Sequence, residues 1–183
     1  MRVTGGTARG RRLKSPPAGV RPTADAVREA IFNVLETRGA DLSRVLDLYA
    51  GSGALGIEAL SRGAGWCDLV ERNPANAALI RENLKLAGVQ ERAHVHQIPA
   101  ERASERLEGP YSLLLADPPY DDDAALAAIE RMARSRLVGP GATLVLEHSR
   151  RRQAPEELGA LKLVWSRRYG DTQVSIYREE GTP

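Results

Sequence analysis

The chain has 183 residues, of which 42% are hydrophobic and 27% charged, a composition that excludes fibrous and disordered proteins and fits one globular domain. No apolar run approaches the about 18 residues of a membrane span, and the first residues lack a secretory signal, so we expect a cytoplasmic protein. The single cysteine, Cys67, excludes an internal disulfide, and its spacing from the three histidines is not that of a metal site.

Basic side chains are concentrated at the start of the chain. Residues 1–28 hold seven basic and one acidic side chain, whereas the remainder holds 19 basic and 23 acidic ones. A basic end on an acidic body is suited to contact phosphates along one edge, although a solvated arginine-rich tail has the same composition. The candidate phosphate contacts are Arg2, Arg9, Arg11, Arg12, Lys14 and Arg28.

The first elements form a small N-terminal unit. Residues 2–14 read as a β-hairpin, with three glycines for the turn and two prolines after it. A helix is predicted from Thr23, with that threonine as its N-cap and Asp25 near the positive end of the helix dipole.

Strands then alternate with helices. Apolar strands are predicted at 44–50, 66–71, 94–98, 111–116 and 142–147, separated by helices at 54–62 and 74–87, a short helix, and a helix at 124–136. This alternation predicts an α/β fold with a parallel sheet covered on both faces. Two further strands, 161–168 and 172–178, are joined by three residues and must therefore form an antiparallel hairpin. A mostly parallel sheet with a C-terminal antiparallel hairpin resembles the Rossmann-like fold of methyltransferases that use S-adenosylmethionine (AdoMet).

A glycine-rich turn follows the first strand. Residues 51–56 read Gly-Ser-Gly-Ala-Leu-Gly, the G-x-G-x-x-G pattern, between a strand and a helix. Glycines there allow a sharp turn and a close approach of the backbone to a ligand. The pattern indicates a nucleotide-like cofactor, and NAD, FAD and AdoMet all fit it.

Two carboxylates narrow the choice among these cofactors. Asp47 lies inside the first apolar strand, where a charge is costly unless a cation or several donors meet it. AdoMet provides an ammonium group for that carboxylate, whereas the diphosphate of NAD would be repelled. Glu71 ends the second strand, where a carboxylate can accept both ribose hydroxyl protons of either cofactor.

The tetrapeptide Asp117-Pro118-Pro119-Tyr120 follows the fourth apolar strand, at the sheet edge where ligands bind. Two prolines fix the backbone and orient its carbonyl groups. Asp117 and a proline carbonyl can accept the two protons of an exocyclic base amine and direct its lone pair toward a methyl donor. Tyr120 offers a face for an extruded base, a contact of about 1–3 kcal/mol.

These motifs together resemble a known family, the bacterial 16S ribosomal RNA guanine-N2 methyltransferases of the D-type Rsm family. The matching segments are residues 5–6, 9–13, 21–23, 25, 27–29, 32–33, 47–62 and 117–120. The resemblance implies a monomeric AdoMet-dependent enzyme acting on 16S RNA or the 30S subunit, with residues 1–22 as an RNA-contacting extension and 23–183 as the methyltransferase domain. It further implies that cofactor contacts come from Arg21, Thr23, Asp47, Ala50, Gly51, Ser52, Gly53, Glu71, Arg72, Ala100, Glu101 and Asp117.

The chain departs from its relatives after the third strand, where many place an acidic or amide residue to accept the adenine amine. Here the sequence is Ile98-Pro99-Ala100-Glu101, so either Glu101 or the backbone takes that contact.

Three other functions share parts of the pattern. A DNA adenine-N6 methyltransferase uses the same tetrapeptide, but this short chain has no separate target-recognition segment. An NAD-dependent oxidoreductase does not explain Asp47 and lacks an evident hydride-transfer acid or base. A non-catalytic RNA-binding protein leaves both the glycine turn and the tetrapeptide unexplained.

Overall fold

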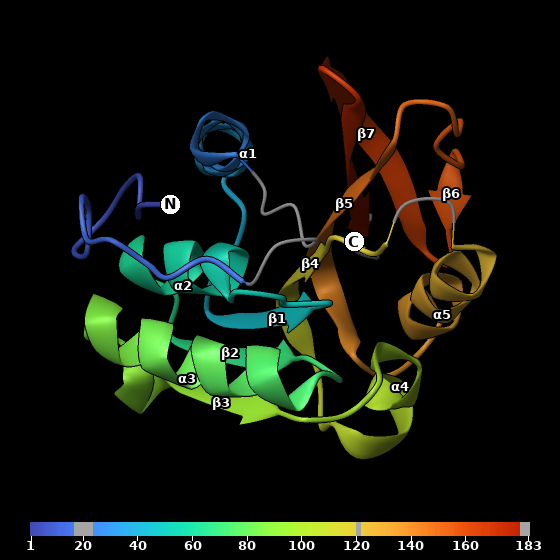
Figure 1. The fold of residues 1–183 in the computed structure, drawn as a ribbon. Coiled ribbons are helices and arrows are strands. Elements are labelled where there is room, and N and C mark those ends of the chain that lie inside the picture. Colours follow the sequence, from blue (N-terminus) through green and yellow to red (C-terminus); the bar gives the residue numbers. More distant parts are fainter. Residues whose placement is uncertain (17–23, 120–121, 180–183) are drawn as a thin grey trace.

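The computed structural model describes residues 1–16, 24–119 and 122–179 and consists of one eight-stranded sheet with helices on both faces (Figure 1). The strands are β1 (Arg44–Leu48), β2 (Trp66–Val70), β3 (Ala93–His96), β4 (Tyr111–Ala116), β5 (Val138–Ser149), β6 (Glu157–Leu158), β7 (Leu161–Tyr169) and β8 (Thr172–Glu179). The helices are α1 (Asp25–Thr37), α2 (Ala54–Ser61), α3 (Pro74–Ala87), α4 (Ala103–Arg106) and α5 (Asp123–Ala133), with 3-10 turns η1 (Gln90–Arg92) and η2 (Ala100–Arg102).

The strand order is β3-β2-β1-β4-β5-β8-β7-β6. Strands β1 to β5 are parallel, whereas β8 runs antiparallel to both β5 and β7. The predicted parallel sheet with an antiparallel C-terminal hairpin is therefore confirmed. The chain order reverses between β1 and β4, and in such sheets the crevice at the carboxyl ends of these strands is the usual ligand site.

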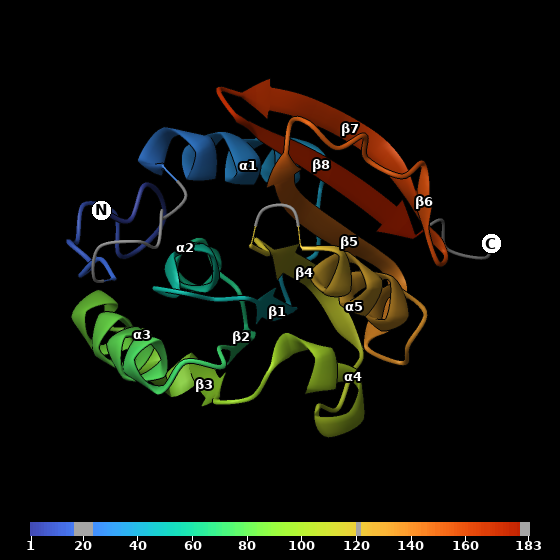
Figure 2. The same cartoon turned by 45° about the vertical axis from the view of Figure 1, so that its right-hand side comes forward.

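Each face of the sheet has its own apolar core. One core is formed with α1, α2 and α3, and the other with α4 and α5. Figure 2 shows these two groups of helices on opposite sides of the sheet. Within the strands, alternate residues enter the two cores: Val45 lies in the first core and Leu46 in the second.

Local signals explain why α3 has the bounds predicted for it. The Asn73 side chain caps its start, accepting hydrogen bonds from the amides of Ala75 (2.8 Å) and Asn76 (3.3 Å). Pro74 occupies the first helical position, and Gly88 ends the helix in the left-handed conformation.

The predicted start of α1 is wrong. This helix begins at Asp25 with Ala24 as its N-cap, and no side chain of the described residues caps it. Thr23, the expected cap, lies outside the described residues.

The first 14 residues form an arm that folds back on itself without regular strands. Arg2 and Arg12 form one isolated antiparallel bridge, and the Gly10 amide donates to the Val3 carbonyl at 2.9 Å. Val3, Ala8 and Leu13 are buried in the core that α2 and α3 share. The arm is therefore packed against the body by its own apolar residues.

Smaller differences from the sequence prediction concern the ends of strands. β5 extends from Val138 to Ser149, longer than expected at both ends, and the two-residue strand β6 was not predicted. Within the described ranges, no helix has the length and apolar character needed to cross a bilayer.

Candidate functional site

A cavity of about 570 Å³ opens at the carboxyl ends of the central strands. Its volume lies in the range of about 300–1,000 Å³ that is usual for sites of small molecules and cofactors. The predicted site residues that line it are Asp47, Ala50, Gly51, Ser52, Glu71, Arg72, Ala100, Glu101, Asp117, Pro118 and Pro119. Sequence segments far apart in the chain thus meet in one cavity, as their placement at strand ends predicted.

Among the predicted catalytic and cofactor residues that the structure describes, Gly53 does not line the cavity. Arg21, Thr23 and Tyr120 lie outside the described residues, so their roles stay predictions. Gly53 instead precedes α2 as its N-cap, in the left-handed conformation (φ 79°). A methyl group there would lie 3.0 Å from the Ile80 side chain, so Gly53 shapes the turn and lets α2 approach α3.

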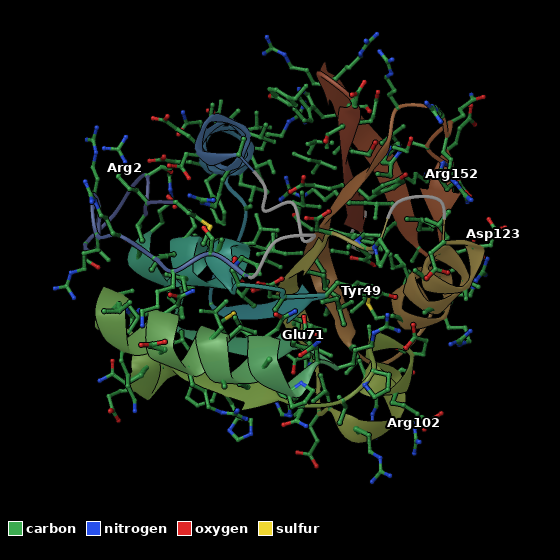
Figure 3. All side chains as sticks on the ribbon, viewed as in Figure 1. Arg2, Tyr49, Glu71, Arg102, Asp123 and Arg152 are labelled. Atoms are coloured by element: carbon green, nitrogen blue, oxygen red, sulfur yellow. The ribbon has the colours of Figure 1, made fainter. Side chains whose placement is uncertain are left out.

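The glycine turn is held by Glu71. One oxygen of this carboxylate accepts a hydrogen bond from the Gly51 amide at 2.9 Å, and the other accepts one from the Asn73 amide at 2.7 Å. Figure 3 shows Glu71 and Tyr49 beside the carboxyl end of β1. Glu71 is thus fixed in orientation while it still faces the cavity, and its remaining lone pairs suit two adjacent hydroxyl groups.

Asp47 is a buried acid on the cavity wall. It is 1% exposed, and its Oδ2 atom accepts a hydrogen bond from the Gly56 amide at 2.8 Å. Burial raises its pKa to about 7, the Gly56 amide opposes this rise, and the nearby charges of Asp117 and Glu71 add to it. A cationic ligand would offset this cost by stabilising the charged form.

The Asp117-Pro118-Pro119 turn enters the same cavity from β4. Residue Ala116, which precedes it, pairs with Leu48 of β1 on one side and Leu146 of β5 on the other. Asp117 is therefore the first residue after the part of β4 that is paired with both β1 and β5. Its charge lies close enough to Asp47 to raise the pKa of that residue.

Several cavity residues were not predicted from the sequence: Tyr49, Asn73, Asn76, Asp122, Glu147, Tyr169 and Thr172. Tyr49 adopts a positive φ of 59°, which is rare for a residue other than glycine and marks a strained turn. Tyr169 and Thr172 come from the β7–β8 hairpin, so only the tertiary fold brings them here. Glu147 had a usable signal, since it ends a predicted strand as Glu71 does.

The six predicted phosphate contacts fall into three groups. Arg2, Arg9 and Arg12 are exposed on the arm. Arg11 and Lys14 are also exposed, but Arg11 donates to the Leu86 carbonyl at 3.1 Å and Lys14 pairs with Glu82. These two contacts attach the arm to α3.

Arg28 does not fit the predicted role. Its side chain has no exposed area and pairs with Glu58 (3.3 Å) and Asp25 (2.8 Å), and it also donates to the Arg2 carbonyl. Burial among these acceptors makes Arg28 a structural cation that joins α1 to the arm and to α2.

Known proteins resemble this chain over most of its length. The family model described as "Conserved hypothetical protein 95" matches residues 1–178. The chain is 37% identical over 185 residues to "Putative rRNA methyltransferase YlbH" of Bacillus subtilis, covering 99% of this chain and 100% of that protein. It is 39% identical over 121 residues to "Ribosomal RNA small subunit methyltransferase D" of Escherichia coli K12, covering 66% of this chain and 60% of that one.

A solved structure agrees with the sequence matches. The "Putative methyltransferase yhhF" of Escherichia coli superposes with a TM-score of 0.87 at 30% identity, over 100% of this chain and 99% of that chain. The methyltransferase fold predicted from the sequence is therefore confirmed.

Proposed function

This chain belongs to the family of D-type ribosomal RNA small subunit methyltransferases, and we propose that it transfers a methyl group from AdoMet to the N2 amine of one guanine in 16S ribosomal RNA. The observation that supports the proposal is that the glycine turn and the Asp117-Pro118-Pro119 turn line a single cavity. In this proposal, a donor held by the first turn and an amine held by the second share the same cavity.

The donor set of the cavity fits AdoMet. Glu71, oriented by the Gly51 and Asn73 amides, suits the ribose hydroxyl groups. Asp47 suits the ammonium group of the methionine part, because a cation lowers the cost of charging this buried acid. The same carboxylate disfavours the diphosphate of NAD. Ala100 and Glu101 line the cavity and are available to the adenine.

Once bound, AdoMet would supply a methyl group on a positively charged sulfur: the amine nitrogen bonds to this carbon as its bond to sulfur breaks, S-adenosylhomocysteine leaves, and the Asp117 carboxylate can accept the surplus proton of the nitrogen. The amine of guanine is a weak nucleophile because its lone pair is delocalised into the ring. Asp117 and the Pro118 carbonyl accept its two N–H groups, turn the lone pair toward the donor and stabilise the positive charge that develops on nitrogen. Tyr120 is proposed to stack on the base.

The arm offers a path from the RNA to the cavity. Pro16, two residues after the arm, lines the cavity, while Arg9 and Arg12 are exposed on the arm itself. Phosphate contacts along the arm would therefore position the RNA strand whose base enters the site.

The test is Asp117→Ala, with Asp41→Ala as the matched control. Asp41 is an exposed acid before β1, at the opposite edge of the sheet. We expect Asp117→Ala to lower the transfer rate by about 10²–10³-fold, the usual effect of removing one group that stabilises developing charge. Binding of S-adenosylhomocysteine should persist in both variants.

The readout is mass-spectrometric mapping of 16S RNA from cells with the wild-type protein, with each variant, and without the protein. The proposal predicts one N2-methylguanine that disappears with the deletion and with Asp117→Ala. Near-normal methylation by Asp117→Ala would show that this residue does not have the proposed role. If the methyl group that the deletion removes lies on another base or in another RNA, the proposed substrate is wrong.

A further inference from the structure

Four carboxylates stand on four neighbouring strands along the cavity. In sheet order, Glu71 follows β2, Asp47 lies in β1, Asp117 follows β4 and Glu147 lies in β5. The proposed function uses the first three, for ribose, ammonium and target amine respectively. Glu147 is the next in the series and has no role in that scheme.

The register places Glu147 directly beside Asp117. Ala116 of β4 pairs with Leu146 of β5, so the residues that follow them are neighbours across the two strands. Val145, two residues before Glu147, lies in the same apolar core as Leu115, two residues before Asp117. Both acids therefore point to the same face of the sheet, with Asp117 nearer the donor and Glu147 one strand further away.

Glu147 is 2% exposed and lines the cavity. A charge buried to this degree is costly, and proteins keep one where it meets hydrogen-bond donors. Since a carboxylate has about four lone-pair sites, it can accept from a ligand as well as from the protein. Beyond β5 in the sheet, Thr172 of β8 and Tyr169 of β7 also line the cavity. The space next to Asp117 is therefore bounded by protein on the side of β8 and β7.

Guanine presents two kinds of donor on this edge, the N2 amine and, on the adjacent ring atom, N1–H. Adenine presents an unprotonated N1 next to its own amine, which a carboxylate repels. When the N2 amine is held by Asp117, the N1–H points to a neighbouring position on the cavity wall. We propose that Glu147 accepts this N1–H and thereby selects guanine over adenine; the inference rests on the proposed function and adds the residue that reads the base.

2-Aminopurine provides a direct test, because it retains the amine at position 2 but has no hydrogen on N1. Small subunits are reconstituted with 16S RNA that carries guanine or 2-aminopurine at the mapped nucleotide. Transfer of labelled methyl groups is then measured as kcat/KM for each base. Wild-type protein should prefer guanine by about 10- to 100-fold, the usual effect of leaving a buried acceptor without its donor.

The variant Glu147→Gln tests the residue itself. Its amide can donate to an unprotonated N1, and its oxygen can still accept guanine N1–H but without a charge. We therefore expect kcat/KM for guanine to fall by up to about 10-fold and the preference over 2-aminopurine to shrink or vanish. Glu130→Gln, on an exposed position of α5, is the control and should keep the wild-type preference. Affinity for S-adenosylhomocysteine should be the same in all three proteins.

The possible outcomes separate this inference from the proposed function. Equal rates of wild-type protein on guanine and 2-aminopurine would overturn the inference, whether or not Glu147→Gln folds. An unchanged preference in a folded Glu147→Gln variant would overturn it as well. Absence of transfer to guanine N2 by wild-type protein would instead reject the proposed function.

Discussion

Arg28 in α1 and Glu58 in α2 form an ion pair in which neither side chain has any exposed area, with Arg28 Nε 3.3 Å from Glu58 Oε2. Glu58 also accepts hydrogen bonds from the amides of Thr4 and Gly5, both at 2.8 Å, and from the Thr4 hydroxyl at 2.7 Å. Burial by itself raises the pKa of Glu58, but the bonds from Thr4 and Arg62 outweigh it and hold the pKa below its usual value. One carboxylate thus joins α1, α2 and the arm.

Replacing this carboxylate should release the arm. For Glu58→Gln we expect a loss of about 1.5–3 kcal/mol in the free energy of unfolding, because buried Arg28 keeps its pair with Asp25 but loses the charge of its partner in α2. Urea denaturation measures this loss, and trypsin should cut the variant faster at Arg9 and Arg12. Glu36→Gln is the control, since Glu36 is 82% exposed and its pair with Arg62 spans 3.9 Å. Equal stability of the two variants would contradict the proposed connection.

Cofactor binding should depend on pH through Asp47. Its pKa is raised to about 7 in the free protein, and the ligand ammonium favours the charged form. Affinity for S-adenosylhomocysteine should therefore rise as the pH increases from about 5.5 to 8, with proton release on binding at the lower pH. Calorimetry in buffers of different ionisation enthalpy measures both effects. Asp47→Asn should bind weakly and without this pH dependence.

The same residue should make the free protein less stable in base. A raised pKa means that the folded state holds a proton that the unfolded chain has already released. The contribution of Asp47 to stability is thus largest below its ordinary pKa of 3.8 and disappears as the pH rises through about 7. Asp47→Asn should accordingly raise the melting temperature at pH 8 more than at pH 5.5. A uniform change at both pH values would argue against a buried charge.

The arm should contribute to RNA affinity through Arg9 and Arg12, both exposed. The double variant Arg9→Ala, Arg12→Ala should weaken RNA binding and lower the slope of log affinity against log salt by about 0.7–0.9 for each phosphate that the protein no longer neutralises. Filter binding at several salt concentrations measures this slope. Arg106→Ala, an exposed arginine on α4, is the control, and affinity for S-adenosylhomocysteine should not change in either protein. An unchanged slope in the double variant would place the phosphate-binding residues elsewhere.

The sequence predicted most of the sheet and the centre of the site because the signals there are local. A strand that ends in a glycine turn or in Asp-Pro-Pro places those residues at the carboxyl edge of a parallel sheet, whatever the rest of the chain does. The bounds of β4 and α3 agree with the prediction, since the apolar run of β4 and the Asn73-Pro74 start of α3 are unambiguous. The family resemblance is confirmed by the match over residues 1–178.

Apart from the local shift at the start of α1, the main errors concern features set by distant partners. Arg28 was counted as a surface cation because arginine usually is one, but its environment is decided by Glu58, 30 residues away. Tyr169 and Thr172 reach the cavity only because β8 pairs antiparallel with β5. The positions of these residues depend on how distant segments pair and pack. No pattern within the segment that holds each residue predicts them.

The succession of carboxylates around the cavity also bears on turnover. AdoMet carries a positive sulfur that S-adenosylhomocysteine does not have, so the proposed reaction would remove one cationic centre from the cavity lined by Asp47, Glu71, Asp117 and Glu147. Coulombic attraction to the spent cofactor is therefore weaker than to the fresh one. If the proposed function holds, we expect the acidic lining to favour exchange of S-adenosylhomocysteine for AdoMet after each methylation.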